Sequence, residues 1–443
     1  MYSDIRRVRA NNHSTSCGLR IANVWLLLGA SLFSSPAPVQ AQQPISRVDL
    51  DQAIELALAH NHALKAVRTQ IEQSQAEEIT AGLRPNPVFT ADYSFLPIFS
   101  PSAFDIPVSQ NPLPQEFDAG LSYTIERGHK RQARLRAARD LTSVTRSQVS
   151  DTERGLVFRV AQQFVAALLA KSNLEFARKD LESFQQTVSL SESRYKAGDI
   201  SEGDLLKIRI QLLQFQTDVS SAELALAQSL ASLRQLLGYD AVPADYEIIG
   251  DLAYTPLRRN KEDLQALALR LRPDLQAAQQ GVTAAESQFL LAKANAKRDL
   301  TTSLQFNHVS GVNAASLGLN IELPFFNRNQ GEIARTRYAV SQSQETRSAV
   351  EEAVLTDVAS AYEAVKSFEK IVQLYTAGAL KHAQDSRDIS EFAYQQGAAS
   401  LLDYLDAERS YRATQLAYRQ ALANYMLAAE QLREAVGTRK LNH

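Results

Sequence analysis

The sequence carries an internal repeat that spans most of its length. The segment YKAGDISEGDLL begins at Tyr195, and YQQGAASLLDYL begins 199 residues later, at Tyr394. In both copies a Tyr stands three residues before a Gly, and an Asp follows that Gly six residues later. A repeat with so long a period indicates one structural unit built twice, and it constrains the fold more than any local pattern does.

Each copy has the pattern of a helix that ends, turns and starts again. Gly198 and Gly397 suit the left-handed conformation at which helices stop, and Ser201 and Ser400 are good N-cap residues for the helix that follows. After the first tip, apolar residues recur at the steps of three and four that are typical of a coiled coil: Leu205, Ile208, Leu212, Phe215 and Val219. The repeat therefore predicts two helical hairpins, with tips near 197–201 and 396–400.

Four segments alternate apolar and polar side chains, two ahead of each hairpin. This alternation predicts strands at about 88–96, 117–126, 300–308 and 315–323, each with one apolar and one polar face. Their length of about nine residues is typical of strands that cross an outer membrane, and we then expect Leu121 and Leu319 to face lipid. A half-buried soluble sheet is the alternative. Closed membrane barrels have at least about eight strands, so several chains would be needed to close one.

The N-terminal segment has the features of a secretory signal. Basic residues precede an apolar run at 21–33, and Val39-Gln40-Ala41 fits the small-x-small rule for cleavage. We therefore expect residues 1–41 to be removed and the mature chain to start at Gln42. The only cysteine, Cys17, lies before the apolar run, so we expect no acyl anchor, disulfide or thiolate metal site.

The remaining chain divides into two repeats, 42–250 and 251–443. Each is expected to contain a helical segment, a strand pair and a long helical hairpin. Between His129 and Tyr195 the sequence has no Pro. At about 1.5 Å per residue, such a helix would be roughly 100 Å long, which no compact soluble domain requires.

Composition and motifs argue against several classes of function. The formal net charge is −2, without the basic excess that nucleic-acid binding requires. The chain has no Gly-rich phosphate loop, no GxSxG elbow and no HExxH helix. Its histidines do not have the spacing of metal ligands. We therefore expect neither an enzyme nor a protein with a resident metal or cofactor.

Two further segments point to a known family. TIERGHKRQARLRAA lies at 124–138 and LPFFNRNQGEIARTR at 323–337, where each second strand gives way to helix. Together with the repeat, which covers essentially the whole mature chain, they make the sequence resemble the TolC family of outer-membrane channel proteins. The two segments are similar to the CzcC-like branch, whose members serve heavy-metal efflux pumps.

The resemblance implies a specific α+β membrane fold. Three chains, each contributing four strands, would form a 12-stranded β-barrel in the lipid of the outer membrane, continued across the periplasm by an α-helical coiled-coil tunnel. Such a homotrimer would meet a periplasmic adaptor and an inner-membrane pump of the RND type.

The resemblance also implies a passive export duct in a tripartite efflux system, with heavy-metal cations as the expected cargo. The alternatives are a duct for multidrug efflux or for type I protein secretion. A purely structural periplasmic coiled coil is a third class, against which the alternating strands argue.

The family pattern implies roles for four residues near the tips. Asp403 and Asp406 are three apart, so they share one helix face, and they match the paired aspartates that line the family's periplasmic entrance. Asp204 and Tyr394 match the residues of its closed-state latch. Ala399 stands where the pattern has a further basic latch residue.

The tips themselves are the expected docking surface for the adaptor. This surface would include Gly198 and Ser201 at the first tip, and Gly397 and Ser400 at the second.

Overall fold

The structure is a computed structural model that describes residues 47–94, 116–309 and 312–441 of the 443-residue chain. These residues belong to one compact unit, Pro44–His443. The expected signal segment 1–41, the expected mature start at Gln42 and the last two residues of the strand expected at 88–96 lie outside the described residues. No helix in the described ranges combines the length and the apolar character that a membrane span requires.

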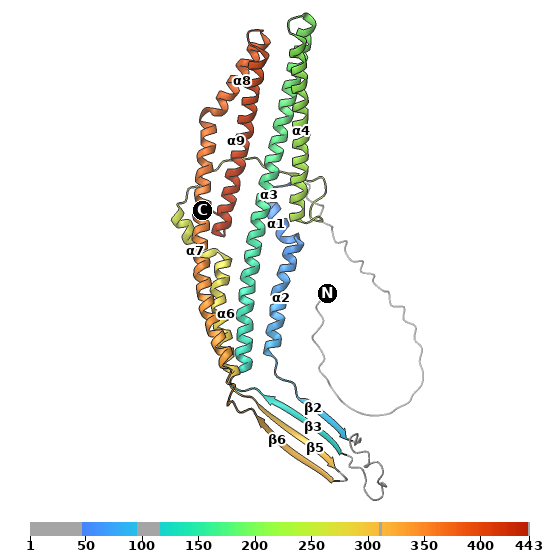
Figure 1. Ribbon diagram of the computed structural model, residues 1–443, viewed down its shortest axis with the longest axis vertical. Helices are drawn as coiled ribbons and strands as arrows, with labels where there is room; N and C mark the ends of the chain where they lie inside the picture. The colour runs from blue at the N-terminus through green and yellow to red at the C-terminus, as the bar shows by residue number, and fades with distance from the viewer. Residues whose placement is uncertain (1–46, 95–115, 310–311, 442–443) are drawn as a thin grey trace, which may run out of the picture. The chain divides into compact units, whose positions relative to one another are not determined.

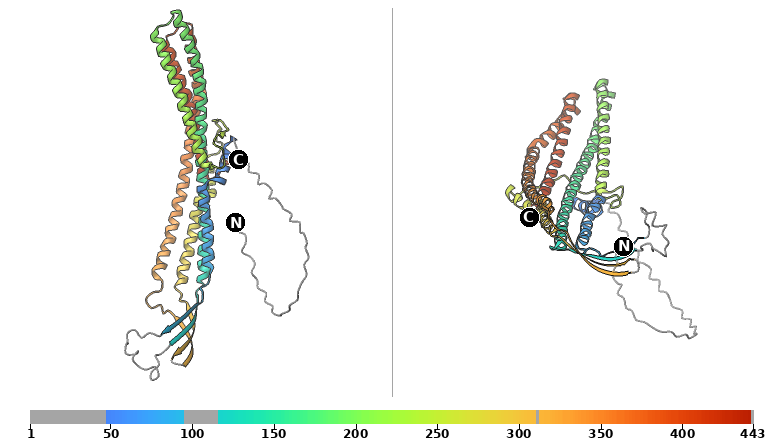
Figure 2. Two further views of the ribbon diagram at one scale, coloured as in Figure 1. Left: turned by 90° about the vertical axis from the view of Figure 1, so that its right-hand side faces the viewer. Right: turned by 60° about the horizontal axis from the view of Figure 1, so that its bottom comes forward.

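Four antiparallel strands form one sheet in the order β2-β3-β5-β6 (Figure 1). They are β2 (Val88–Ser94), β3 (Glu116–Ile125), β5 (Leu300–Val309) and β6 (Val312–Ile321). The last strand begins at Val312, three residues before the predicted 315. The prediction began too late because Ala314 and Ala315 interrupt the alternation of apolar and polar residues in the sequence. Strand β3 of the first repeat pairs with β5 of the second along its whole length. Both repeats therefore build a single sheet, which Figure 2 shows as one curved layer.

The two faces of this sheet differ in polarity. A row of apolar side chains crosses all four strands on one face: Phe89, Leu121, Leu304 and Leu317. The next row, on the opposite face, consists of small or polar residues: Thr90, Gly120, Gln305 and Ser316. Leu317 is 86% exposed and Leu319 is 70% exposed. The described residues therefore leave the apolar face uncovered.

The first hairpin consists of α3 (Lys130–Ala197) and α4 (Glu202–Leu237). Helix α3 has 68 residues, which at about 1.5 Å per residue corresponds to roughly 100 Å. It contacts α2, α4, α6 and α9, so it lies at the centre of the helical part. The predicted seam between α3 and α4 is present, and the rings of Phe184 and Phe215 stack in it at 4.4 Å.

The second hairpin is assembled from three pieces and a return helix. Helix α7 (Gln330–Leu374) leads into a π-helical turn, η2 (Tyr375–Ala379), and then α8 (Leu380–Gln395). Helix α9 (Leu401–Val436) returns along α8 and α7. Gly378 in the turn has φ 154° and ψ −21°, a conformation that essentially only Gly adopts. The periodicity of the sequence did not reveal this interruption.

Shorter helices pack beside the two hairpins. The helical segment expected at the start of the first repeat forms α1 (Leu50–His60) and α2 (His62–Gly82). They separate at Asn61, whose side chain caps α2 at Leu64 and donates to the carbonyl of Leu236 at 3.0 Å. In the second repeat, α5 (Lys261–Leu271) and α6 (Pro273–Asn295) separate where Pro273 starts α6.

The link between the repeats contains a small sheet that the sequence did not show. Strand β1 (Arg47–Val48) pairs in parallel with β4 (Glu247–Ile248). Val48, Tyr246 and Ile248 are buried in the apolar core of the first repeat, with residues of α1, α3 and α4. The segment between α4 and α5 therefore contains a packed element.

Candidate functional site at the helical tips

The first tip is closed by local hydrogen bonds. Gly198 ends α3 in the left-handed region, with φ 86°. Ser201 caps α4 and accepts from the backbone N–H of Asp204 at 3.1 Å. The Asp204 carboxylate accepts from the Ser201 hydroxyl at 2.9 Å and from Lys207 Nζ at 3.1 Å. These hydrogen bonds, that from Ser201 first, lower the pKa of Asp204 below its ordinary value.

The second tip has a similar geometry, with a reciprocal backbone hydrogen bond that the first tip lacks. Gly397 has φ 75°, and Ser400 forms a capping box with Asp403 at the start of α9. The Asp403 carboxylate accepts from the Ser400 hydroxyl at 2.7 Å and from its backbone N–H at 3.3 Å. Asp406 is exposed on the same helix face and lies 3.6 Å from Arg409. The predicted N-caps and Gly turns are therefore present at both tips.

The two residues predicted to form a latch are not joined in this chain. Tyr394 is 3% exposed, its hydroxyl shares a hydrogen bond of 3.2 Å with Ser191, and its ring stacks on Tyr404. Among the described residues, no hydrogen bond connects it to Asp204, which is bonded at its own tip. Ala399 offers no basic partner to the latch, but Arg194 of α3 donates to the Tyr394 carbonyl at 2.7 Å.

A buried charge cluster joins the hairpins below the tips. Arg412 of α9 lies with its Nε 2.6 Å from the Asp180 carboxylate on α3, and it also pairs with Asp218 on α4. Glu408, one turn before Arg412, is buried beside Asp180, whose negative charge acts on it. We call Asp180, Asp218, Glu408 and Arg412 the interhairpin clasp. A single cation thus contacts both helices of the first hairpin from the second.

The electrostatics of the clasp follow from its burial. Asp180 is 5% exposed and Glu408 is 6% exposed. Burial, followed by the negative charge of Asp180, raises the pKa of Glu408 to about 8, and burial also raises the pKa of Asp180. Burial therefore favours the protonated form of Glu408, while the charge of Asp180 is balanced by Arg412.

Sequence reasoning missed the clasp, although one signal was present. Asp180 stands four residues before Phe184, and Glu408 four residues after Tyr404, each on the buried stripe of its helix. An acid at such a seam position requires a buried partner.

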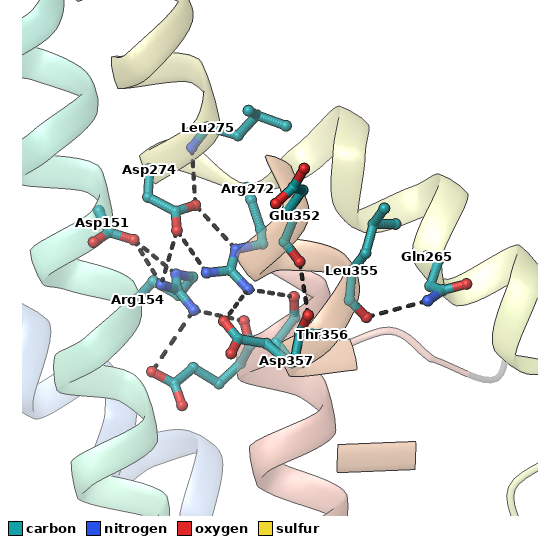
Figure 3. Close-up of polar contacts among 12 residues, drawn as sticks. Asp151, Arg154, Gln265, Arg272, Asp274, Leu275, Glu352, Leu355, Thr356 and Asp357 are labelled. Carbon is teal, nitrogen blue, oxygen red and sulfur yellow. Dashed lines mark hydrogen bonds and ion pairs between the residues drawn. The ribbon is translucent and has the colours of Figure 1, made fainter. Parts of the chain in front are cut away.

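A second charge cluster lies between the two repeats at the level of α6. Arg272 is 5% exposed and donates to Asp357 on α7 at 2.8 Å. Figure 3 shows it beside Arg154 of α3, with Asp274 in contact with both. Arg154 also donates to the carbonyl of Glu434 on α9 at 2.8 Å. This cluster joins α3 of the first repeat to α7 and α9 of the second.

An exposed apolar face on a four-stranded sheet, adjoining helical hairpins of this length, defines a channel-type protein of the outer membrane. The sequence matches the family described as outer membrane efflux protein over residues 53–239 and 264–438. The chain belongs to the outer membrane efflux protein family, and its resemblance to the TolC family is confirmed. It is thus an outer-membrane protein with its helical part in the periplasm, and its family consists of channel proteins, not enzymes.

Relatives with different names align along most of the chain. The pyoverdine export outer membrane protein OpmQ of Pseudomonas aeruginosa is 25% identical, over 95% of this chain and 91% of that protein. The cobalt-zinc-cadmium resistance protein CzcC of Cupriavidus metallidurans is 22% identical, over 91% of this chain and 93% of that protein. A crystal structure of CusC superposes with a TM-score of 0.72 at 21% identity, over 89% and 94% of the two chains. That likeness shows the fold.

Proposed function

We propose that three copies of this chain form a 12-stranded barrel, with four strands from each chain, continued by a helical tunnel. One observation carries this proposal: the sheet presents an uncovered apolar face next to hairpins roughly 100 Å long. Strands β2 and β6 are the edges of the sheet in the single chain. Unpaired edges associate with further strands, and four strands are too few to close a barrel.

Substitutions on neighbouring residues of β6 test the barrel. Leu319→Arg places a charge on the apolar face, where it costs about 2–4 kcal/mol near the middle of the bilayer. The matched control, Asn320→Arg, places the same charge on the polar face. We expect trimers of the first variant to be less stable in lipid than those of the second. Equal tolerance would contradict the assignment of the faces, and a folded monomer in detergent would contradict the trimer.

The proposed trimer acts as the passive outer-membrane duct of a tripartite efflux system. Its partners would be a periplasmic adaptor, which docks on the tips at Gly198, Ser201, Gly397 and Ser400, and an inner-membrane RND pump. The hydrogen-bonded turns at both tips support this, because they give the adaptor a defined surface. Crosslinking to the adaptor should decrease when residues flanking Gly397 are changed in trimers that still assemble.

The proposed cargo is heavy-metal cations, which the CzcC relative supports. The alternatives are organic compounds, which the OpmQ relative favours, and proteins of a type I secretion system. Loss of the protein should raise the cellular content of divalent transition-metal ions. Unchanged metal content together with retained organic compounds or retained secreted protein would favour an alternative.

We place the entrance of the duct at Asp403 and Asp406. Both are exposed on one face of α9, so two carboxylates from each of three chains would surround the opening. Crowded carboxylates favour bound cations. The double variant Asp403→Asn with Asp406→Asn should weaken the block of conductance by multivalent cations, and Asp385→Asn on α8 is the control. Unchanged block in folded trimers would rule out the ring.

The latch between Asp204 and Tyr394 is part of the same proposal. It requires Tyr394 to exchange its bond with Ser191 for one with Asp204 when the trimer closes. Asp204→Ala combined with Tyr394→Phe should then raise single-channel conductance. Ser191→Ala removes the bond to Tyr394 seen in this chain, together with a bond to the Thr187 carbonyl on the same helix, and should not raise it.

A further inference from the structure

A basic hollow lies where the apolar face of the sheet meets the helices. On the apolar face of the sheet, the last side chains of β3 are Tyr123 and Ile125. Next to them is a hollow of about 270 Å³, which is also lined by Arg84 of the loop before β2 and by Arg131 in the first turn of α3. The hollow thus combines apolar side chains from the exposed sheet face with guanidinium groups.

Two of the charges in this hollow have no acidic partner. Lys130 is paired with Asp299 at 2.8 Å, and Glu126 with Arg134 at 2.6 Å. Arg84 and Arg131 form no ion pair with any residue that the structure describes. Within the described ranges, the one acceptor of Arg131 is the Gly82 carbonyl, at 3.4 Å. The hollow therefore carries two uncompensated positive charges.

We propose that this hollow binds the phosphate headgroup of an anionic glycerophospholipid from the periplasmic leaflet of the outer membrane. Guanidinium groups bind phosphate oxygens through paired hydrogen bonds, and basic pockets at the membrane boundary select anionic headgroups. Tyr123 and Ile125 continue from the hollow onto the apolar face, where they would contact the acyl chains. A free phosphate ion would leave these apolar contacts unused, so the occupant is a lipid.

This inference rests on the proposed function, in which the apolar face of the sheet meets lipid. A second basic hollow, lined by His129, Arg136, Lys293 and Lys297, lies between α3 and α6. No residue of the four-stranded sheet lines it. It therefore offers a control with cations but without side chains of the apolar sheet face.

The test compares lipids retained by purified trimers. Wild-type protein would be incubated with equal amounts of phosphatidylglycerol and phosphatidylethanolamine of the same acyl chains, and native mass spectrometry would count the adducts. We expect a roughly tenfold preference for phosphatidylglycerol. Arg84→Gln with Arg131→Gln should bring the ratio close to one. Lys293→Gln with Lys297→Gln should leave the preference unchanged, and inorganic phosphate should not displace the lipid.

Each outcome separates this inference from the proposed function. Equal retention of the two lipids by wild-type trimers would overturn the headgroup site but not the barrel. Equal loss of preference in both double variants would show a diffuse charge effect and also overturn the site, as would displacement by inorganic phosphate. Trimers that retain neither lipid would contradict the lipid-facing sheet itself. Arg84→Gln alone changes only the loop before β2, so a reduced preference in that variant excludes a folding defect of α3.

Discussion

The two helical hairpins share the structure of their tips but differ in their shafts. Helix α3 of the first hairpin continues for 68 residues without interruption. The corresponding helix of the second hairpin is divided at η2, where Gly378 adopts φ 154°. Both hairpins thus have the Gly turn and the Ser cap at the tip. Only in the second is the shaft, the helix that leads to the tip, interrupted; we call this interruption at η2 the joint.

The burial of side chains also differs between the two hairpins. Along α3, 21 residues are buried, whereas in α8 only Tyr394 is. Ile389 and Phe392 of α8 are 69% and 64% exposed. Helix α3 of the first hairpin is therefore fixed by packing along its length, and the upper part of the second hairpin is held by Tyr394, Leu401, Tyr404 and the interhairpin clasp. We expect the second hairpin to be the one that moves, and four predictions test this comparison.

The largest effect is expected from breaking the clasp. Arg412→Met leaves the buried Asp180 without its cation, and removal of one partner from a buried ion pair costs about 3–5 kcal/mol. The free energy of unfolding by urea measures this loss. Arg409→Met is the control, because Arg409 is exposed and its pair with Asp406 contributes about 0–1 kcal/mol. Similar losses in both variants would mean that the clasp does not attach the second hairpin.

The second effect is a pH dependence of the same attachment. Burial raises the pKa of Glu408 to about 8, so the native state holds a proton that the unfolded chain releases at its ordinary value of 4.5. This contribution to stability is complete below the ordinary value and is lost as pH rises to the folded pKa. The slope is at most about 1.4 kcal/mol per pH unit for one proton.

Glu408→Gln keeps a neutral side chain of nearly the same size at this position and removes the titration. Urea midpoints between about pH 5 and pH 8 should therefore fall in the wild type and stay nearly level in this variant. Glu391→Gln on α8 is a control that retains both buried acids. A wild-type profile that rises with pH would mean that Glu408 is ionised in the folded protein.

The third effect concerns the joint itself. Gly378→Ala places a Cβ in a conformation open essentially only to Gly, with a cost of about 1–3 kcal/mol. The control is Gly155→Ala in α3, where an added Cβ meets no atom within 4 Å and helix propensity favours Ala. We expect destabilisation for the first substitution and slight stabilisation for the second. Destabilisation of both by the same amount would remove the distinction between a jointed and a continuous shaft.

The sequence predicted what repeats and what alternates. Gly198 and Gly397 predicted both tips, because each stands at the same distance from a preceding Tyr and a following Asp. Ser201 and Ser400 predicted the caps. Both predictions are possible because a helix end is determined by a few neighbouring residues. The strands followed from side-chain alternation, which is also local. The family followed from the repeat together with the segments 124–138 and 323–337.

The features that were missed depend on packing between distant segments. Asp180 and Glu408 come together only because α3 lies against α9, and no local period records that contact. The turn at Gly378 interrupts an otherwise continuous helical pattern, so the sequence alone left its conformation open. Strands β1 and β4 have two residues each, too few for alternation to be visible.

The smallest effect separates the two tips. The Ser400 cap forms a complete capping box with Asp403, whereas Ser201 lacks the reciprocal bond to its own backbone N–H. Replacing an N-cap Ser by Ala costs about 1 kcal/mol. Each substitution removes a hydroxyl bond to the carboxylate three residues on. Ser400→Ala should cost more than Ser201→Ala, because only the Asp403 carboxylate also accepts from the backbone N–H of its cap residue, and loss of the Ser400 hydroxyl weakens that reciprocal bond. Amide hydrogen exchange in the first turns of α9 and α4 measures each loss separately.

If the second tip also depends on its cap because α8 is little buried, exchange after Ser400→Ala should increase in α8 as well as in α9. After Ser201→Ala it should increase in α4 and remain unchanged in α3, which is held by packing. Increased exchange in the upper part of α3 would contradict the view that the first hairpin is fixed along its length.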